Sequence, residues 1–388
     1  MISVQSIIVP FLVAFIATLW IHPKVLKIAI MKNLVDNPDA RKLQRNPTPV
    51  MGGIAVFFGL ILGLATSQII STNNMFIYTA AMMIMLYIGT IDDILSLSPK
   101  MRFIIEIAVI TLLMFVTGAA INNFFGLWGV HSLAVWLSVP LTIIACVGII
   151  NAINLIDGVN GLSTGFCVMA SSLFAIFFYH SQNLTMCVIA VSAAGAIIPF
   201  FLHNVFGRSS KMFIGEGGTL LLGCVMSVFV LNMLKSDSLC TQYCSWGIGL
   251  VPLTLAILCI PVFDTLRVMI MRILRGTSPF SADKTHLHHL FIEMGFSHIG
   301  TTVSILTLNC LVILGGYISY KCGANVNVQF YVVVALSLLV TVGLYYGMRF
   351  CGKHDLAPYR LMQRLGKMTH VERKGIFLWI QKIVDWRE

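Results

Sequence analysis

The sequence predicts an all-α polytopic membrane protein with about eleven transmembrane helices. Of the 388 residues, 58% are hydrophobic and only 10% are charged, and the mean hydropathy is +0.91. A hydrocarbon core of roughly 30 Å requires about 20 apolar residues for each helix that crosses it, and eleven stretches of approximately that kind follow one another along the chain. The stretches lack the alternation of membrane β-strands, so helices are expected and a barrel is excluded.

The predicted helices differ in length, and the stretch 75–91 is among the shortest. The first stretch has no basic segment before it and no cleavage pattern, so it is interpreted as a retained helix and not as a signal peptide. Residues 1–348 are interpreted as a catalytic membrane domain, and residues 349–388 as a basic, amphipathic cytoplasmic tail on the inner leaflet. The predicted spans are 2–21, 51–70, 75–91, 103–118, 133–150, 162–180, 184–202, 212–234, 247–270, 301–320 and 327–348.

Lys and Arg predict which side of the membrane each connection faces. If the first connection is cytoplasmic, all of the 25 basic residues except Lys235 and Lys321 lie on the cytoplasmic side. Cytoplasmic loops are enriched in Lys and Arg, so the N-terminus is expected to be periplasmic and the C-terminus cytoplasmic. A basic rim beside anionic lipid also accounts for most of the net charge of +10. Membrane lipid is therefore an expected partner, and nucleic acid is not.

Three polar stretches interrupt the apolar chain on the predicted cytoplasmic side. A chain with so few ionisable groups gathers carboxylates and imidazoles at one water–lipid boundary, which predicts a site for a charged substrate beside the bilayer. Loops carry function when a rigid scaffold positions them. The stretches are Asp92-Asp93, Asn154-Leu-Ile-Asp157 and Thr285-His286-Leu-His288-His289.

The first polar stretch is a pair of acids. Asp92 and Asp93 follow the predicted helix 75–91 and precede Lys100 and Arg102. Adjacent carboxylates repel one another unless they share a cation or a proton. The pair is therefore interpreted as a ligand for a divalent metal or as a general base that acts on a phosphate, with a solvated helix end as the alternative.

The second polar stretch connects two strong helices and reads Asn151-Ala-Ile-Asn154-Leu-Ile-Asp157-Gly158-Val-Asn160-Gly161. Asn154 and Asp157 are three residues apart, so a helical turn would place them on one face. Gly158 allows a ligand or a neighbouring helix to approach the backbone closely. An ordinary turn between helices would explain the Asn and Gly residues, but a connection with three Asn, one Asp and no base favours a functional site.

A further acid opens the predicted helix 212–234, in Phe213-Ile-Gly215-Glu216-Gly217-Gly218. A helix N-terminus stabilises a carboxylate, so Glu216 is either a cap or a ligand for a hard metal ion. The glycines allow backbone N–H groups to face a phosphate.

The histidine stretch lies in the longest predicted cytoplasmic loop. Three imidazoles in four positions are a candidate transition-metal site, but Arg275 and Lys284 precede them. Contact with an anionic group is therefore favoured, and a chance polar loop is the alternative. Asp264, within a predicted helix, is either a functional acid or the partner of Arg267.

Taken together and in this order, these stretches resemble the polyprenyl-phosphate N-acetylhexosamine-1-phosphate transferase family. The resemblance covers about residues 20 to 300. It rests on Pro49-Val-Met-Gly52-Gly53, Asp92-Asp93, Asn151-Ala-Ile-Asn154-Leu-Ile-Asp157-Gly158, Phe213-Ile-Gly215-Glu216, Ser278-Pro279-Phe280-Ser281 and His286-Leu-His288-His289.

The resemblance implies a reaction at the cytoplasmic face of the bacterial inner membrane. The phosphate of undecaprenyl phosphate attacks the β-phosphorus of UDP-GlcNAc or another UDP-HexNAc. The products are a lipid-linked sugar diphosphate, which starts a surface glycan, and UMP. Mg²⁺ is the implied cofactor, with Mn²⁺ as a substitute.

The resemblance also implies roles for single residues. Asn154 and Glu216 would bind the metal. Asp92 and Asp93 would deprotonate or orient the lipid phosphate, and Asp157 would lie near the nucleotide or the metal. Substrate contacts are expected from Lys100, Arg102, Asn151, Gly215, His286, His288 and His289.

Several residues depart from the family pattern. Glu216 stands where many relatives have Asp, and Gln44 where relatives often have His. Asn160 replaces the second acid of the family's N-x-x-D-G-x-D-G pattern, so an essential acid is not expected there. Ile94 and the His-x-His-His order disfavour the muramoyl-pentapeptide branch, which is the alternative substrate class.

Two other classes of protein are alternatives. A secondary transporter would place polar residues near the bilayer midplane in paired repeats, whereas this chain gathers them at one edge. A membrane zinc hydrolase would use the histidine loop. The sequence leaves open which amino sugar is used and whether the protein is a homodimer.

Overall fold

The computed structural model describes residues 5–36, 47–67, 73–279, 284–371 and 375–385. Gln44 and the Phe280-Ser281 part of one family motif lie outside these residues. The described chain is almost entirely helical, as the sequence predicts, and its four short strands form two separate antiparallel pairs. The strands are β1 (Val35–Asp36), β2 (Thr48–Pro49), β3 (Asn123–Leu127) and β4 (Val130–Ser132).

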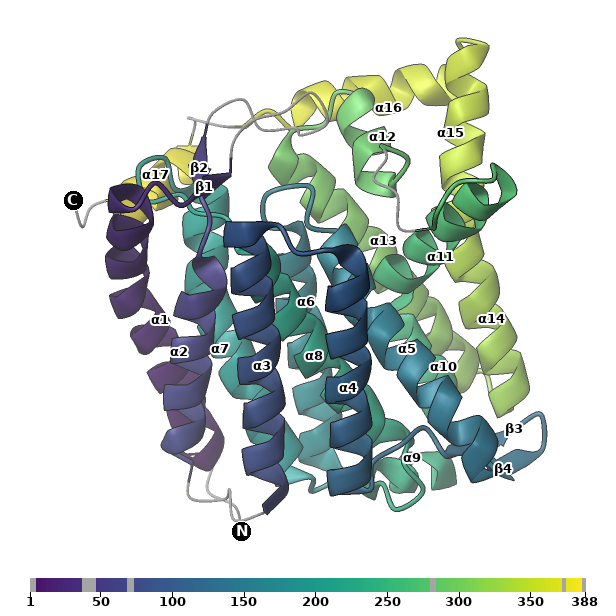
Figure 1. Ribbon diagram of the computed structural model, residues 1–388. Coiled ribbons are helices and arrows are strands. Elements are labelled where there is room, and N and C mark those ends of the chain that lie inside the picture. Colours follow the sequence, from purple (N-terminus) through teal and green to yellow (C-terminus); the bar gives the residue numbers. More distant parts are fainter. Residues whose placement is uncertain (1–4, 37–46, 68–72, 280–283, 372–374, 386–388) are drawn as a thin grey trace.

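Each of the eleven predicted stretches falls on a helix or on consecutive helices (Figure 1). The first eight stretches correspond to α1 (Gln5–Met31), α2 (Gly52–Ala65), α3 (Asn73–Leu95), α4 (Pro99–Thr117), α5 (Val135–Leu155), α6 (Leu162–His180), α7 (Leu184–Phe206) and α8 (Gly215–Leu234). The last three correspond to α10 (Leu250–Ile257) with α11 (Cys259–Leu274), to α13 (His298–Lys321), and to α14 (Val326–Leu338) with the π-helical turn η2 (Leu339–Gly343) and α15 (Leu344–Lys353). The remaining helices are η1 (Leu239–Thr241), α9 (Gln242–Ser245), α12 (Leu287–Glu293), α16 (Ala357–Met368) and α17 (Gly375–Asp385).

Most of these helices are suited to a bilayer. Within the described residues, eight spans are long and apolar enough to cross a membrane, and the bent pair α10–α11 would make a ninth. Helix α2 has 14 residues, and α4 carries Lys100, Arg102 and Glu106 in its first half. The chain is therefore a multi-pass, all-α membrane protein.

The predicted helix 247–270 is not continuous, because the chain turns by 77° between α10 and α11. Asn309 of α13 satisfies backbone groups that the break frees. Its Oδ1 accepts a hydrogen bond from the N–H of Ile260 at 3.1 Å, and its Nδ2 donates to the carbonyls of Ala256 and Ile257 at 3.3 and 3.1 Å. A break in an apolar environment requires such partners, and hydropathy does not reveal it because the apolar run continues through the bend.

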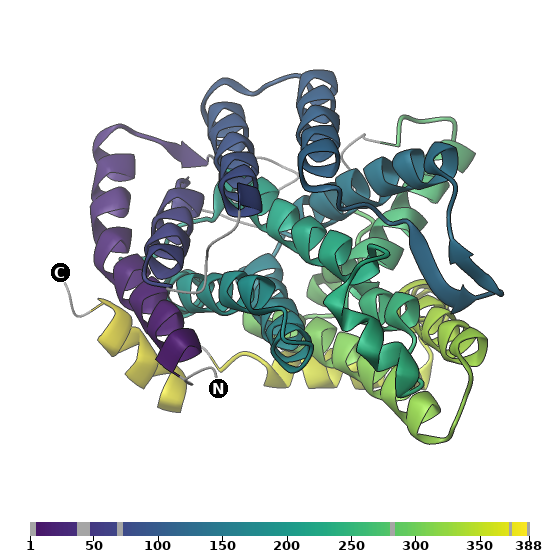
Figure 2. The ribbon, with the colours of Figure 1, turned by 90° about the horizontal axis from the view of Figure 1, so that it is seen from below.

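Helix α8 lies at the centre of the bundle, and its side chains from Gly217 to Leu234 are buried (Figure 2). Glycines let two other helices reach its first turn. A Cβ on Gly89 of α3 would lie 2.5 Å from the Cα of Gly217, and a Cβ on Gly53 of α2 would lie 2.4 Å from the nitrogen of Gly218. Small residues at such crossings let helix backbones come into contact, and here they bring the end of α3 against the start of α8.

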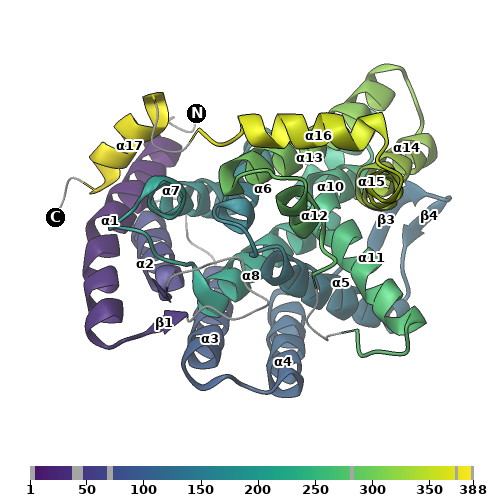
Figure 3. The ribbon, with the colours of Figure 1, turned by 90° about the horizontal axis from the view of Figure 1, so that it is seen from above.

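The two ends of the bundle differ. The β1–β2 pair and the connections α3–α4, α5–α6 and α7–α8 lie at one end, and the start of α1 and the β3–β4 hairpin lie at the other (Figure 1). Helices α16 and α17 run across the first end, and α17 lies beside α1 and α7 (Figure 3). The polar motifs from the sequence therefore gather at a single end of the molecule.

Candidate active site

The carboxylate of Asp93 caps the first turn of α8. Its Oδ1 accepts a hydrogen bond from the N–H of Glu216 at 3.0 Å, and its Oδ2 accepts one from the N–H of Gly217 at 3.3 Å. Free N–H groups and the helix dipole both favour a negative charge at this position. Gly215 has a φ of +76°, and a Cβ there would lie 2.5 Å from Oδ2 of Asp93. A side chain at position 215 is therefore excluded by both the backbone conformation and the space.

Arg102 of α4 connects acids that belong to three helices. Its Nη1 lies 3.2 Å from Oδ2 of Asp92 and 2.8 Å from Oε2 of Glu216, and its Nε lies 3.6 Å from Glu106. The other oxygen of Asp92 accepts a hydrogen bond from the N–H of Leu97 at 2.7 Å. Arg102 thus holds the Glu216 carboxylate while Asp92 fixes the turn between α3 and α4.

Asn154, at the end of α5, reaches the same oxygen of Glu216. Its Nδ2 donates to Oε2 of Glu216 at 2.5 Å and to Oγ1 of Thr219 at 2.8 Å. Asn151, one turn earlier, instead donates to Glu106 and to the carbonyl of Val147. The predicted neighbours Asn154 and Glu216 are therefore in contact, whereas Asn151 holds the buried acid of α4.

Asp157 follows α5, and its carboxylate accepts a hydrogen bond from the hydroxyl of Ser163 in α6. Withdrawal from bulk water raises the pKa of Asp157 to about 7. The Ser163 hydrogen bond lowers the pKa, and the negative charges of Glu216 and Asp93 raise it further. A carboxyl group in this environment is half-protonated near neutral pH unless a cation is added.

The three histidines of the predicted loop have different surroundings. Nδ1 of His286 lies 2.9 Å from Oδ2 of Asp264, whose other oxygen is 2.7 Å from Nη2 of Arg267. His288 is buried against Gly158, where a Cβ would lie 2.2 Å from its Nε2. Burial also holds the pKa of His288 well below its usual range, so this ring is neutral.

His289 is the member of this trio that lines a cavity. His286 and His288 fix the loop behind it, and Asp264 is the structural partner of His286. Within the described residues, no three His, Cys, Asp or Glu side chains are close enough together to hold a metal ion by themselves.

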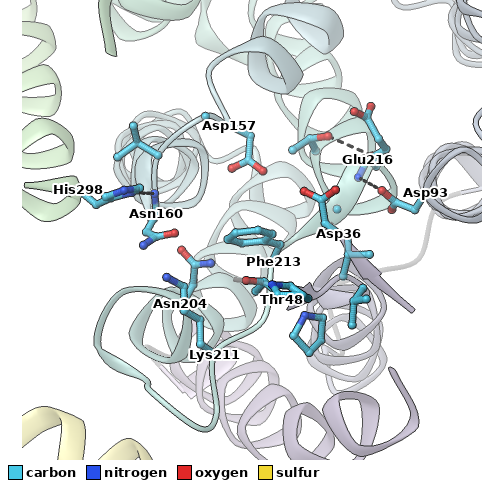
Figure 4. A pocket seen from close by; sticks show the side chains of 18 of the residues that line it. Asp36, Thr48, Asp93, Asp157, Asn160, Asn204, Lys211, Phe213, Glu216 and His298 are labelled. Atoms are coloured by element: carbon cyan, nitrogen blue, oxygen red, sulfur yellow. Dashed lines mark hydrogen bonds between the residues drawn. The ribbon is translucent and has the colours of Figure 1, made fainter. Parts of the chain in front are cut away.

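The site opens into a cavity of about 1080 Å³ (Figure 4). Six of the residues predicted from the sequence line it: Asp93, Asn154, Asp157, Gly215, Glu216 and His289. Asp92, Lys100, Arg102, Asn151, His286 and His288 are outside its lining. Lys100 is exposed on the first turn of α4, so substrate contact by this residue remains a prediction.

Sequence reasoning missed several other cavity residues. Asp36 and Thr48 come from the β1–β2 pair, and Asn204 from the end of α7; no motif marked them. Lys211 contributed to the orientation of the chain only, although a base beside the Phe213-Ile-Gly215-Glu216 motif was a usable signal. The remaining lining residues include Asn160, Phe213 and His298.

Hydrogen bonds to backbone groups explain how the loops that line the cavity meet. The N–H of Phe213 donates to the carbonyl of Pro49 at 2.8 Å, and the N–H of Gly52 donates to the carbonyl of Phe213 at 3.0 Å. Asn204 accepts a hydrogen bond from the N–H of Gly161 at 2.7 Å and donates to the carbonyl of Met212 at 2.9 Å. Three loops are thereby joined around the cavity.

The charges in the cavity are unevenly distributed. Figure 4 shows Asp36, Asp93 and Glu216 on one side, with Asn204 and Lys211 on the other. Among the described lining residues, the acids are Asp36, Asp93, Asp157 and Glu216, and the permanently basic residues are Arg208 and Lys211. An anionic ligand would be repelled from the acidic side unless a cation accompanies it.

Comparison with known proteins gives a family match and several relatives. Residues 75–234, which include Asp93, Asp157 and Glu216, match the model of glycosyl transferase family 4. The chain is 32% identical over 294 residues to a probable undecaprenyl-phosphate N-acetylglucosaminyl 1-phosphate transferase of Bacillus subtilis, a match that covers 75% of this chain and 79% of the relative.

Two further relatives are named undecaprenyl-phosphate alpha-N-acetylglucosaminyl 1-phosphate transferase. The protein from Yersinia pestis is 30% identical over 345 residues, which cover 87% of this chain and 89% of the relative. The protein from Escherichia coli O157:H7 is 29% identical over 361 residues, which cover 90% and 92%. The resemblance that the motifs indicated is confirmed, and the chain belongs to glycosyl transferase family 4.

Proposed function

We propose that this glycosyl-1-phosphate transferase transfers N-acetylglucosamine 1-phosphate from UDP-GlcNAc, or the equivalent group from a related UDP-HexNAc, to undecaprenyl phosphate. The names of the relatives from Bacillus subtilis and Yersinia pestis contain this acceptor and this sugar. The observation that carries the proposal is the convergence of three motifs on one cavity. Asp93 from α3, Asp157 after α5 and Glu216 from α8 all line it, although 123 residues separate the first from the last.

The proposed site faces the cytoplasm of a bacterial inner membrane that the chain crosses eleven times. The cavity is lined by the connections that are predicted to be cytoplasmic, and α1 begins at the opposite end of the bundle from α17 (Figure 1). This placement suits both substrates, because a UDP-sugar is cytoplasmic and the phosphate of a polyprenyl lipid lies at the membrane surface.

Mg²⁺ is the proposed cofactor, and Mn²⁺ would substitute for it. Four carboxylates face two permanently basic side chains in the cavity, and burial, together with the negative charges of Glu216 and Asp93, raises the pKa of Asp157 to about 7. Glu216, Asn154 and Asp157 are the proposed protein ligands. Mg²⁺ commonly uses one or two carboxylates together with waters and substrate phosphates, so a closed protein cage is not required. The bound ion would neutralise the diphosphate.

The protein groups then have distinct tasks. Asp93, held by two N–H groups of α8, orients the lipid phosphate or accepts its proton. An oxygen of the lipid phosphate bonds to the β-phosphorus, and the bond from that phosphorus to the bridging oxygen breaks. The electron pair leaves on UMP, and Arg208 and Lys211 balance the charge of the diphosphate to a similar extent before and during the transfer. Catalysis of phosphoryl transfer depends mainly on such positioning and charge neutralisation.

Arg102 and His289 have two further roles in the proposed site. Arg102 holds the carboxylate of Glu216 at 2.8 Å from behind the cavity. His289 faces the cavity from a loop that Asp264 and His286 fix. It is proposed to contact the sugar diphosphate.

The experiment uses the purified protein in lipid nanodiscs with undecaprenyl phosphate and a panel of labelled UDP-sugars. We expect UMP and a lipid-linked sugar diphosphate in equal amounts with UDP-GlcNAc, and no product after chelation until Mg²⁺ is restored. Absence of lipid product with every UDP-HexNAc would contradict the proposal. Product with UDP-MurNAc-pentapeptide alone would move the protein to the other substrate class.

A further inference from the structure

The loop between α7 and α8 contributes the permanently basic residues of the cavity lining. Arg208 and Lys211 both belong to it, and Ser209 lines the cavity between them. The loop has left α7 and has not yet entered α8, and the N–H groups of Arg208 and Ser210 donate to a side chain outside both helices. A contact that holds the α7–α8 loop in place therefore also holds the basic side of the cavity in place.

The carboxylate that holds this loop belongs to α17, near the C-terminal end of the chain. Asp385, the last residue of α17, accepts hydrogen bonds from the N–H of Arg208 at 3.0 Å, from the N–H of Ser210 at 3.1 Å and from the hydroxyl of Ser210 at 2.7 Å. Partial burial would raise the pKa of Asp385, but the hydrogen bonds from Ser210 and Arg208 hold it below its usual range. The carboxylate is therefore charged at neutral pH, and charge-assisted hydrogen bonds are the stronger kind.

The rest of α17 packs against the bundle and places Asp385 beside the loop. Phe377 is buried, and its ring lies 4.9 Å from that of Phe206 at the end of α7. Figure 3 shows α17 beside α7 and α1. Nε2 of His22 in α1 also lies 2.9 Å from the carbonyl oxygen of Ser210. Ser210 is thus held by both α1 and α17.

We propose that Asp385 is a positioning residue for the nucleotide-sugar donor, through which the carboxy-terminal helix α17 holds Arg208 and Lys211 in the cavity. The inference rests on the proposed function, because the loop's bases are taken to bind the UDP-diphosphate group. The acceptor is served by Asp93 on the other side of the cavity (Figure 4). Loss of the Asp385 contact should therefore weaken donor binding and leave acceptor binding unchanged.

The expected loss of donor affinity follows from the fraction of time that the α7–α8 loop spends in its binding position. If the loop holds its binding position for only about 10–30% of the time, the apparent dissociation constant for the donor rises about 3–10-fold. Interactions lost equally from the ground state and the transition state raise KM and leave kcat unchanged. Asp385→Asn should therefore raise the KM for UDP-GlcNAc by that factor. The KM for undecaprenyl phosphate and kcat should stay within about twofold.

The test uses the full-length protein in nanodiscs with three further variants. Asp385→Glu keeps the carboxylate and should recover part of the donor affinity. Ser210→Ala removes one of the hydrogen bonds and should raise the donor KM less than Asp385→Asn does. Asp355→Asn is the matched control, because this carboxylate also lies in the tail, is 75% exposed and is 3.8 Å from its nearest base, Arg360. It should behave as the unsubstituted protein does.

Hydrogen exchange supplies a readout that does not need activity. The amides of Arg208 and Ser210 should exchange faster in Asp385→Asn than in Asp355→Asn, because their acceptor is weakened. Unchanged donor KM in Asp385→Asn, or an equal rise in the KM of both substrates, would overturn the inference. If Asp385→Asn fails to fold, Ser210→Ala decides by the same criteria. An unsubstituted protein without transferase activity would instead contradict the proposed function, and exchange would still report on the contact.

Discussion

The imidazole of His288 occupies the space where a side chain on Gly158 would begin. A Cβ at position 158 would lie 2.2 Å from Nε2 of the ring, which is far inside van der Waals contact. Two motifs that are far apart in the sequence therefore fit against each other, and Asp157 and His289 are their neighbours in the cavity. The glycine of one motif and the histidine of the other act as a single packing unit.

Gly158→Ala should displace this unit and lower turnover by at least about tenfold, because misplacement of catalytic groups by about 1 Å is costly. The initial rate of UMP release measures the effect. Gly148→Ala is the matched control, since a Cβ at position 148 in α5 meets no atom within 4 Å. The double variant Gly158→Ala/His288→Ala should recover part of the loss if the clash is the cause. Equal activity of the two alanine variants would contradict this explanation.

Glu216 tests the proposed metal site. Glu216→Gln removes the charge that lies 2.8 Å from Arg102 and should require at least about tenfold more Mg²⁺ for half-maximal activity. Glu216→Asp keeps a carboxylate and should retain more activity than the Gln variant. A Mg²⁺ titration of UMP release distinguishes them. Identical Mg²⁺ requirements in all three proteins would remove Glu216 from the metal site.

The raised pKa of Asp157 predicts a pH-dependent stability. Below the ordinary pKa of 3.8, the folded and unfolded states both hold the proton. Between 3.8 and about 7 the folded state alone keeps it, so the stability that this group contributes is lost as the pH rises through about 7. In EDTA, the melting temperature should therefore rise in Asp157→Asn relative to the unsubstituted protein, and more so at pH 8 than at pH 6.

Added Mg²⁺ should compensate for this loss if it binds near Asp157. The increase in melting temperature on adding Mg²⁺ should be greater at pH 8 than at pH 6, and this pH dependence should disappear in Asp157→Asn. If Mg²⁺ raises the melting temperature of the unsubstituted protein equally at both pH values, the ion does not bind near Asp157.

Asn309 is predicted to stabilise the bend between α10 and α11. Asn309→Leu keeps a similar volume but leaves the N–H of Ile260 and the carbonyls of Ala256 and Ile257 without this partner. Each buried group left without a hydrogen bond costs about 1–3 kcal/mol. The melting temperature in detergent should fall, whereas Leu308→Ile at the neighbouring position should change it little. Unchanged stability of Asn309→Leu would show that other groups satisfy the bend.

The motifs allowed the acidic side of the site to be predicted from the sequence. Asp93 and Glu216 stand at helix ends, where a short polar signal interrupts an apolar run, and their contact follows from the glycines that let α3 and α8 meet. Asp157 belongs to a similar interruption. These signals are local, so sequence reading can find them.

The opposite side of the cavity carries no such local signal. Asn204 lies at the end of an apolar helix, and Thr48 precedes the Pro49 motif without belonging to it. Ser210, which precedes Lys211, is held by Asp385, which is 175 residues further along the chain. The prediction of His286 as a substrate contact also missed its partner Asp264, because the two residues are 22 positions apart and meet only through tertiary packing. Tertiary packing alone brings these residues together.

The central claim is that the acids of this cavity perform sugar 1-phosphate transfer to a lipid phosphate. The most direct measurement compares lipid-linked product and UMP formed by the unsubstituted protein, Asp93→Asn and Asp92→Asn from UDP-GlcNAc and undecaprenyl phosphate. We predict equimolar products from the unsubstituted protein, a loss of at least about 100-fold in kcat for Asp93→Asn, and a smaller loss for Asp92→Asn, which lies outside the cavity lining. Full activity of folded Asp93→Asn, or UMP release without lipid product, would contradict the claim.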